Sequence, residues 1–230
     1  MDLQLKEVAE LLRVSESTLK RWIEEGRVPS YRLHDQYRFN RSEIEGWLLR
    51  QKIGVGEELA EPENVSGDLQ FGLFRAVHRG LVLDSVPARS KQELISLCMQ
   101  EMAHRFDLDA DVLTDLFMDR EKMMSTGLGH GIAVPHTRDF LLNTHFDVVL
   151  VVYPEKPLDY ESLDGQPVHT CFFLFACDDR RHLNLLSKIA HLSSSETICK
   201  FLQQKPQKDQ LLACLKEWES KLVSQRQQIS

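Results

Sequence analysis

The sequence has no hydrophobic run long enough to cross a membrane. Its longest apolar stretches, Phe146–Tyr153 and Cys171–Cys177, have the length of single β-strands, whereas a membrane-spanning helix needs about 20 apolar residues. The amino-terminal residues also lack the charged and then apolar order of a secretory signal. We therefore expect a cytoplasmic protein without membrane insertion.

Several motifs of common enzyme classes are also absent. No pair of the five cysteines has the two-residue spacing of a metal site, so we expect reduced cysteines that pack as small apolar residues. The chain lacks the glycine-rich Gly-Lys-Ser/Thr motif that holds nucleotide phosphates and the Gly-x-Ser-x-Gly turn of hydrolases. The sequence therefore supports neither a nucleotide-binding P-loop nor a serine hydrolase.

What is present divides into two parts of different charge. The formal net charge of the 230 residues is −7, yet residues 1–52 carry ten lysines and arginines against nine acidic residues, and the remainder carries 18 against 26. Between them, residues 53–68 combine three glycines, one proline and five acidic groups, a composition typical of a linker. We predict a head at residues 1–52, a linker at 53–68, a body at 69–222 and a tail at 223–230.

The head has the spacing of two short helices followed by a β-hairpin. Apolar residues from Leu5 to Leu12 recur every three or four positions, Ser15 can cap a second helix, and Gly26 ends it. Two helices joined by such a short turn and followed by a wing can place the second helix in a DNA major groove. The candidate DNA contacts are Ser17, Lys20 and Arg21 on the second helix and Arg32 and Arg38 on the wing. A small helical domain with a solvated charged face is the alternative.

Residues 3–49 resemble an excisionase-type or MerR-like winged helix-turn-helix DNA-binding domain. The matching residues run from Lys6 to Ser15 and continue through Thr18-Leu19, Arg21-Trp22-Ile23, Gly26-Arg27-Val28-Pro29, Tyr37-Arg38-Phe39 and Trp47-Leu48. The family often has glycine at the tip of the wing, where this chain has His34-Asp35-Gln36. Such domains usually act in pairs, so the resemblance implies DNA binding through residues 1–52 by a homodimer or with a partner.

One segment of the body, Ser125–His136, combines several glycines with two histidines. Its glycines at positions 127, 129 and 131 free the backbone for close approach to a ligand. A short strand, Ile132–Val134, then leads through a proline to His136, which is held beside an open loop and positioned for nucleophilic work. Two alternatives stay open at this point, a structural histidine and a zinc site built from His130, His136 and His182.

Residues 69–222 resemble enzyme IIA of the fructose/mannitol type in the bacterial phosphoenolpyruvate phosphotransferase system, nearest to its nitrogen-regulatory branch. The resemblance rests on Ser125-Thr126-Gly127-Leu128-Gly129-His130-Gly131-Ile132-Ala133-Val134-Pro135-His136, on Pro167-Val168-His169 with Phe172–Phe175, and on His182–Ala190. It implies a phosphotransferase component that receives a phosphoryl group from an HPr-like phosphocarrier and needs no metal or other cofactor.

The resemblance also implies roles for individual residues. His136 matches the phosphorylated histidine, and Arg120 and His182 match the family's active-site arginine and second histidine. A guanidinium suits phosphate oxygens. Backbone N–H groups of a phosphate loop, Gly129, His130 and Gly131, would add anion contacts. For His130 itself, a loop-shaping role is favoured over a second phosphorylation site.

The fold class expected for the body is α/β, a mixed sheet flanked by helices on both faces. The periodicity predicts helices over 90–106, 109–118, 181–192, 194–203 and 208–222, and strands over 132–134, 146–153 and 168–176.

Three functions fit the two domains. The leading hypothesis is a phosphohistidine carrier whose phosphorylation state controls an output on DNA. The second is an interaction module whose head binds protein and whose body sequesters a regulated kinase or transporter. The third is a soluble enzyme IIA that passes phosphate to a sugar-specific enzyme IIB.

Overall fold

The protein is described from a computed structural model that covers residues 2–12, 14–33, 36–41, 43–44, 46–47, 72–137, 139, 141 and 146–227. The predicted linker at 53–68 and the wing-tip residues His34 and Asp35 lie outside these residues. Where the chain is described, no helix is both long and apolar enough to span a membrane.

The head folds as the helical spacing predicts. Helices α1 (Leu5–Leu12) and α2 (Glu16–Glu24) are joined by a short turn, and the Ser15 side chain caps α2 by accepting a hydrogen bond from the Thr18 N–H at 3.0 Å. The wing strands β2 (Tyr31–Leu33) and β3 (Gln36–Asn40) pair antiparallel. One strand was missed, since β1 (Asp2–Gln4) pairs with the other edge of β3 and makes the wing three-stranded. Helical backbone follows within residues 41–47.

The body is built on a five-stranded mixed sheet in the order β4-β7-β8-β6-β5. Its central strands β7 (Val148–Pro154) and β8 (Thr170–Phe175) are antiparallel to each other and fully buried. Strand β4 (Val82–Val86) runs parallel to β7, and β6 (Ile132–Ala133) runs parallel to β8. The edge strand β5 (Gly127–Gly129) forms a hairpin with β6.

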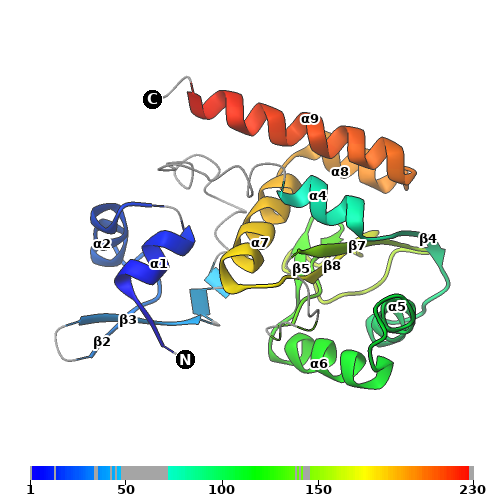
Figure 1. The fold of residues 1–230 in the computed structure, drawn as a ribbon, viewed down its shortest axis with the longest axis horizontal. Helices are drawn as coiled ribbons and strands as arrows, with labels where there is room; N and C mark the ends of the chain where they lie inside the picture. Colours follow the sequence, from blue (N-terminus) through cyan, green and yellow to red (C-terminus); the bar gives the residue numbers. More distant parts are fainter. Residues whose placement is uncertain are drawn as a thin grey trace.

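Helices cover both faces of this sheet, which confirms the predicted fold class (Figure 1). Successive residues of a strand point to opposite faces, and β7 divides accordingly. Val149 and Val151 pack on one side with α4 (Gly72–Arg79), α7 (Asp179–Ser193), α8 (Glu196–Gln203) and α9 (Lys208–Gln227). Leu150 and Val152 pack on the other side with α5 (Lys91–Phe106) and α6 (Ala110–Met123).

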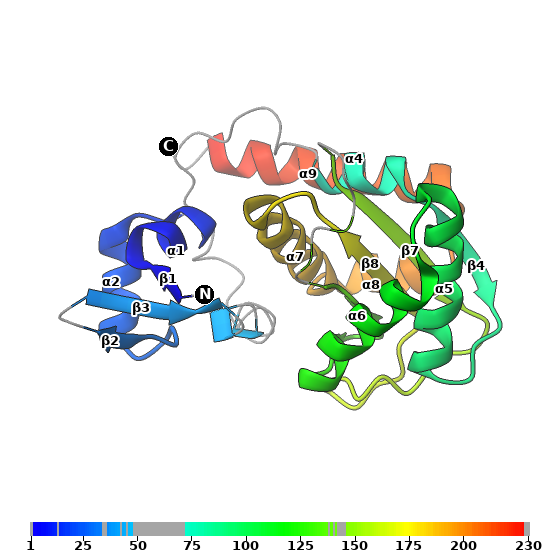
Figure 2. The ribbon, with the colours of Figure 1, turned by 60° about the horizontal axis from the view of Figure 1, so that its bottom comes forward.

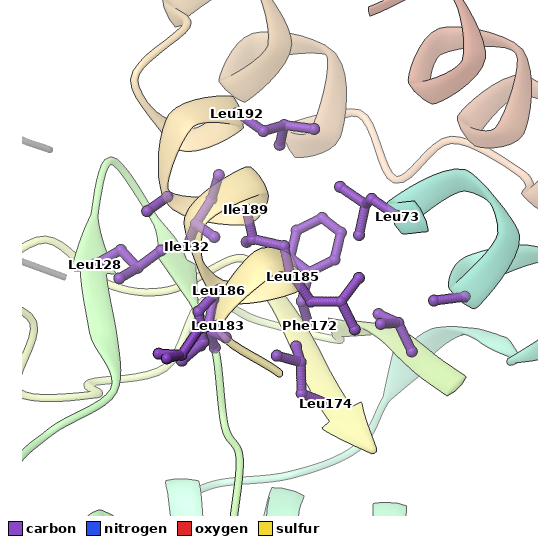
Figure 3. Packing of buried hydrophobic residues seen from close by; sticks show 14 of the residues in the cluster. Leu73, Leu128, Ile132, Phe172, Leu174, Leu183, Leu185, Leu186, Ile189 and Leu192 are labelled. Atoms are coloured by element: carbon purple, nitrogen blue, oxygen red, sulfur yellow. The ribbon is translucent and has the colours of Figure 1, made fainter. Parts of the chain in front are cut away.

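The face under α7 holds much of the aliphatic core. Figure 3 shows Leu185 and Ile189 of α7 near Phe172 of β8 and Leu73 of α4, all of which are buried. Burial of a leucine or isoleucine side chain stabilises the fold by about 1.5–3 kcal/mol. This packing fixes the position of α7 over β8, and therefore the position of the residues in the first turn of α7.

The predicted elements of the body exist, with shifted ends. Helix α6 continues to Met123, past the predicted end at residue 118, and α9 continues to Gln227, past residue 222 into the predicted tail. Helix α4 and strands β4 and β5 were not predicted. Glu219 of α9 stabilises the start of α4, because its carboxylate accepts hydrogen bonds from the backbone N–H groups of Leu73 and Phe74 at 3.1 and 2.9 Å and pairs with Lys188.

Candidate functional site

The candidate site lies where two parallel strands end. His136 continues the line of β6 and bridges to Leu174 near the end of β8, with the same register that pairs Ile132 with Thr170. The Leu174 N–H donates to the Pro135 carbonyl at 3.0 Å. The carboxyl ends of parallel strands are common positions for ligand sites in α/β folds. Strand pairing therefore holds the backbone of His136 in a fixed place.

The His136 ring is held by a contact to each nitrogen. Nδ1 lies 2.8 Å from the Val134 carbonyl oxygen, and the Nε–H of Arg120 donates to Nε2 at 3.0 Å. A carbonyl oxygen only accepts and a guanidinium only donates, so Nδ1 carries the proton and Nε2 presents its lone pair. The geometry thus singles out Nε2 as the nucleophilic atom of a neutral imidazole.

Arg120 reaches this ring from the last turn of α6. Its side chain is buried, and Nη1 donates to the Met124 carbonyl at 3.0 Å, which anchors the guanidinium at the end of the helix. The next residue, Glu121, is also buried and accepts hydrogen bonds from the Thr126 hydroxyl at 2.6 Å and the Thr126 N–H at 3.2 Å. Lys91 Nζ lies 3.7 Å from the same carboxylate. The network secures the segment that follows Arg120.

Glu121 was not among the residues predicted for the site. A glutamate next to an arginine at a helix end is usually solvated, so the sequence carries no signal for this buried network. The Val134 carbonyl was missed for a similar reason, because a backbone atom has no identity in the sequence.

His182 joins from the first turn of α7. Its ring centre lies 5.2 Å from that of His136 with the planes at 66°, an edge-on arrangement. The cap of this helix is the Asp178 side chain, which accepts a hydrogen bond from the Arg181 N–H at 2.8 Å. Arg120, His136 and His182 therefore come together from α6, the segment after β6 and α7, although Arg120 and His182 are 62 positions apart in the chain.

The site is closed, contrary to the expectation of an open loop beside His136. His136 has no exposed surface, and Arg120 and His182 are 6% and 1% exposed. The sequence showed that glycines were near the histidine but not how the helices would cover it. A reaction partner can therefore reach the His136 ring only when the site opens.

The predicted phosphate loop lies at the other end of β6. Gly129, His130 and Gly131 form the β5–β6 turn, all three with positive φ, and the His130 N–H donates to the Asp164 carboxylate at 2.7 Å. Ile132 to His136 spans about 13 Å at about 3.3 Å per strand residue. The close approach allowed by these glycines is to the protein itself, since a Cβ on Gly131 would lie 2.3 Å from the His169 ring.

The distance between His130 and His136 also argues against the zinc alternative. His130 lies in that turn, whereas His136 and His182 are together at the far end of β6. Across the residues with described positions, no group of three or more histidine, cysteine, aspartate or glutamate side chains could hold a metal ion.

The predicted DNA-binding side chains of the head lie on its surface. Ser17, Lys20 and Arg21 are exposed along α2, Arg32 is exposed on the wing and Arg38 is half-buried. Arg21 lies 3.9 Å from Glu25, and Arg38 donates to the Gln36 side chain at 2.8 Å. These groups form a mixed-charge surface on α2 and β2–β3.

Comparisons with known proteins agree with both parts of the chain. The family described as "Phosphoenolpyruvate-dependent sugar phosphotransferase system, EIIA 2" matches residues 77–218, and a helix-turn-helix domain family matches residues 3–52. The nitrogen regulatory protein of Escherichia coli (strain K12) is 29% identical over 156 residues, covering 67% of this chain and 95% of that protein. The fructose-specific EIIABC component of Bacillus subtilis is 33% identical over 107 residues, which cover 45% of this chain and 16% of that protein.

Solved structures show the same fold. Nitrogen regulatory protein IIA-Ntr from Neisseria meningitidis superposes with a TM-score of 0.53 at 28% identity, covering 59% of this chain and 92% of that one. The mannitol IIA protein of Escherichia coli superposes with a TM-score of 0.50 at 18% identity, covering 58% of this chain and 94% of that one. This similarity supports the fold alone.

Proposed function

The chain belongs to the EIIA 2 family of the phosphoenolpyruvate-dependent sugar phosphotransferase system, and on this premise we propose that it carries a phosphoryl group on Nε2 of His136. The group comes from an HPr-like phosphocarrier, and its presence is coupled to regulation through the head. The resemblance to nitrogen regulatory proteins favours a regulatory carrier over a component of sugar uptake.

One observation carries the proposal. A buried neutral imidazole, fixed as the Nδ1–H form by Val134, directs the lone pair of Nε2 toward the guanidinium of Arg120. A phosphoryl group on Nε2 would place its oxygens beside this guanidinium, and the planar fork of an arginine matches the geometry of phosphate oxygens.

The transfer step is balanced without any further reactant. The Nε2 lone pair of His136 forms the new N–P bond while the N–P bond of the donor's phosphohistidine breaks, and the donor ring nitrogen recovers its lone pair. The Nδ1 proton of His136 stays in place and continues to bond to the Val134 carbonyl. Phosphoryl transfer depends mainly on in-line positioning and charge stabilisation, which these residues provide.

Arg120 and His182 have separate roles in this step. Arg120 moves its donated hydrogen bond from Nε2 to the phosphoryl oxygens, where its planar fork matches their geometry. His182 lies edge-on to the acceptor ring and offers a further N–H donor to those oxygens. Because the His130 N–H is already donated to Asp164, we assign no phosphate contact to the glycine turn.

The proposal is tested by labelling with phosphoenolpyruvate and the upstream carriers. His136→Ala should abolish acid-labile labelling, while His104→Ala, which removes an exposed histidine of α5, should leave it unchanged. Full labelling of the His136→Ala protein would refute the assignment.

The head provides the expected route to an output. Exposed Ser17, Lys20 and Arg21 on α2 favour DNA as its ligand over a purely structural role, and two copies acting together would double a small contact area. A salt-dependent gel shift separates this function from a head that binds protein and a body that binds a kinase or transporter. Transfer of label to a purified enzyme IIB would instead support a plain enzyme IIA.

A further inference from the structure

The head lies against the body at the helix that carries His182. Arg41, just after β3, forms an ion pair with Asp179 in the first turn of α7. Helix α1 contacts α7 as well, and both views show α1 on the side of the head nearest to that helix (Figures 1 and 2). Apolar side chains of the head and of α7 belong to one continuous buried cluster.

This contact is close to the candidate site. Asp179 precedes His182 by three residues, so the two side chains share a face of α7 with Cβ atoms about 5–6 Å apart. The His182 ring centre is in turn 5.2 Å from that of His136. Arg41 is therefore joined to the reactive ring through one helical turn and one ring contact.

The Arg41–Asp179 pair is partly removed from water. The Arg41 side chain is 17% exposed and that of Asp179 is 49% exposed. An ion pair with one partner shielded holds its geometry better than one on a fully solvated surface. The head is thus attached to the site by a specific polar contact in addition to apolar packing.

A phosphoryl donor must also approach the site at the first turn of α7. To form the N–P bond, the donor must bring phosphorus to Nε2, which now contacts Arg120 and has no exposed surface. The described groups around Nε2 come from α6 and α7, and α7 is the one that the head contacts. The first turn of α7, where the head is attached, is therefore a candidate for the movement that loading requires.

We propose that the head and the phosphocarrier compete for one surface, the first turn of α7 around Asp179 and His182. With the head docked, His136 is closed and loads slowly; with the head released, the donor reaches Nε2. The inference rests on the proposed phosphoryl transfer to His136, but the contact between head and body has its own readout.

The surface of the head that we propose for DNA stays uncovered in the docked state. In both views α2 and β2 lie on the side of the head away from the body, and Ser17, Lys20, Arg21 and Arg32 are exposed. Docking therefore excludes the carrier protein from the body without burying the surface proposed for DNA.

The test compares full-length variants by their initial rate of labelling from the upstream carrier. Arg41→Ala and Asp179→Asn each break the pair and should raise the rate by up to about fivefold, the range for loss of one partly exposed ion pair. The double variant Arg41→Asp/Asp179→Arg restores a pair with reversed polarity and should return the rate toward that of the wild type.

A matched control and a second readout accompany the rates. Arg75→Ala removes an exposed arginine from α4 and should load like the wild type. Small-angle X-ray scattering of the unphosphorylated proteins should give a larger radius of gyration for the two single variants and a restored value for the double variant, and circular dichroism shows whether each variant is folded.

The outcomes distinguish the two proposals. Single variants that load at the wild-type rate, or a reversed pair that does not restore slow loading, would overturn competition for this surface. Failure of every protein, including the wild type, to be labelled at His136 would overturn the proposed function, and the scattering data would then decide separately whether Arg41 holds the head to α7.

Discussion

At the scale of single residues, the candidate site depends on the groups that hold the His136 ring in place. Each ring nitrogen of His136 contacts a partner of fixed character, a carbonyl that accepts and a guanidinium that donates. The protonation state of the imidazole follows from these partners. The reactivity that we propose is therefore a property of Val134 and Arg120 as much as of His136.

Replacement of Arg120 should separate its charge from its shape. Arg120→Ala removes both and should lower the rate of His136 labelling by about 100-fold, the usual scale for loss of a charge-stabilising donor. Arg120→Lys keeps the charge without the planar fork and should recover only part of the rate. Labelling rates at saturating donor measure both variants, and a wild-type rate for Arg120→Ala would contradict the role.

His169 should make stability depend on pH. Burial lowers its pKa from the ordinary value of 6.5, while a backbone contact at His130 opposes the shift. The unfolded chain then binds a proton more readily than the folded one, so the free energy of unfolding should fall as pH drops below about 6.5 and level off below the folded pKa.

The check is urea unfolding of the wild type between pH 7.5 and pH 5. His169→Gln removes the titration and should show a flatter profile, whereas His104→Gln, which replaces an exposed histidine, should follow the wild type. Identical profiles for the wild type and His169→Gln would show that another group dominates.

At the scale of elements, the glycine turn between β5 and β6 is a packing device. Gly131 has φ +74°, and a Cβ there would meet the His169 ring at 2.3 Å, whereas Gly165 has φ +68° with nothing within 4 Å. The two glycines share a left-handed backbone, which would strain an alanine at either position, but they differ in the space available to a Cβ. They form a natural pair for separating the two effects.

Gly131→Ala should therefore destabilise the protein more than Gly165→Ala. The change at residue 165 should cost about 1 kcal/mol from the left-handed backbone alone, and the change at residue 131 should cost about 1–3 kcal/mol more because the ring must shift. Thermal or urea unfolding measures the difference. Equal losses would mean that His169 moves aside freely.

The same scale shows what the sequence could and could not predict. Helices with long apolar periodicity, such as α5 and α7, and the strands β7 and β8 were predicted because their patterns repeat over many residues. Helix α4 and strand β4 are short, and β5 is a Gly-Leu-Gly strand with little intrinsic preference. Their existence depends on partners elsewhere in the chain, such as Glu219 for α4.

For the candidate site, the sequence named three residues by resemblance, whereas their arrangement in space could not be predicted. Arg120, His136 and His182 were identified by resemblance, and their approach to one another follows from α6, β6 and α7 packing around one sheet. The closure of the site and the ion pair between Arg41 and Asp179 depend on residues 138 positions apart. No local pattern could indicate such a contact.

At the scale of the whole molecule, charge limits what the head can do alone. Residues 1–52 are almost neutral and the remainder is acidic, so phosphate backbones are attracted only by local groups on α2 and the wing. Binding of DNA should accordingly be weak for one copy and strongly dependent on salt.

A gel shift at several salt concentrations should test this limit. Lys20→Ala and Arg21→Ala should each weaken binding and reduce the slope of log affinity against log salt by about one if the residue contacts a phosphate. Glu24→Gln, on the same exposed helix, should strengthen binding or leave it unchanged. Slopes that do not respond to either basic residue would exclude α2 as the contact surface.

The Nδ1–H of His136 donates a hydrogen bond to the backbone carbonyl oxygen of Val134, which does not take up or release protons near neutral pH. In the proposed transfer, the phosphoryl group binds to and leaves Nε2 while the proton on Nδ1 stays in place. Exchange of the group with its donor should run at nearly the same speed in heavy water as in ordinary water. A large solvent isotope effect on that exchange would mean that the ring relays protons after all.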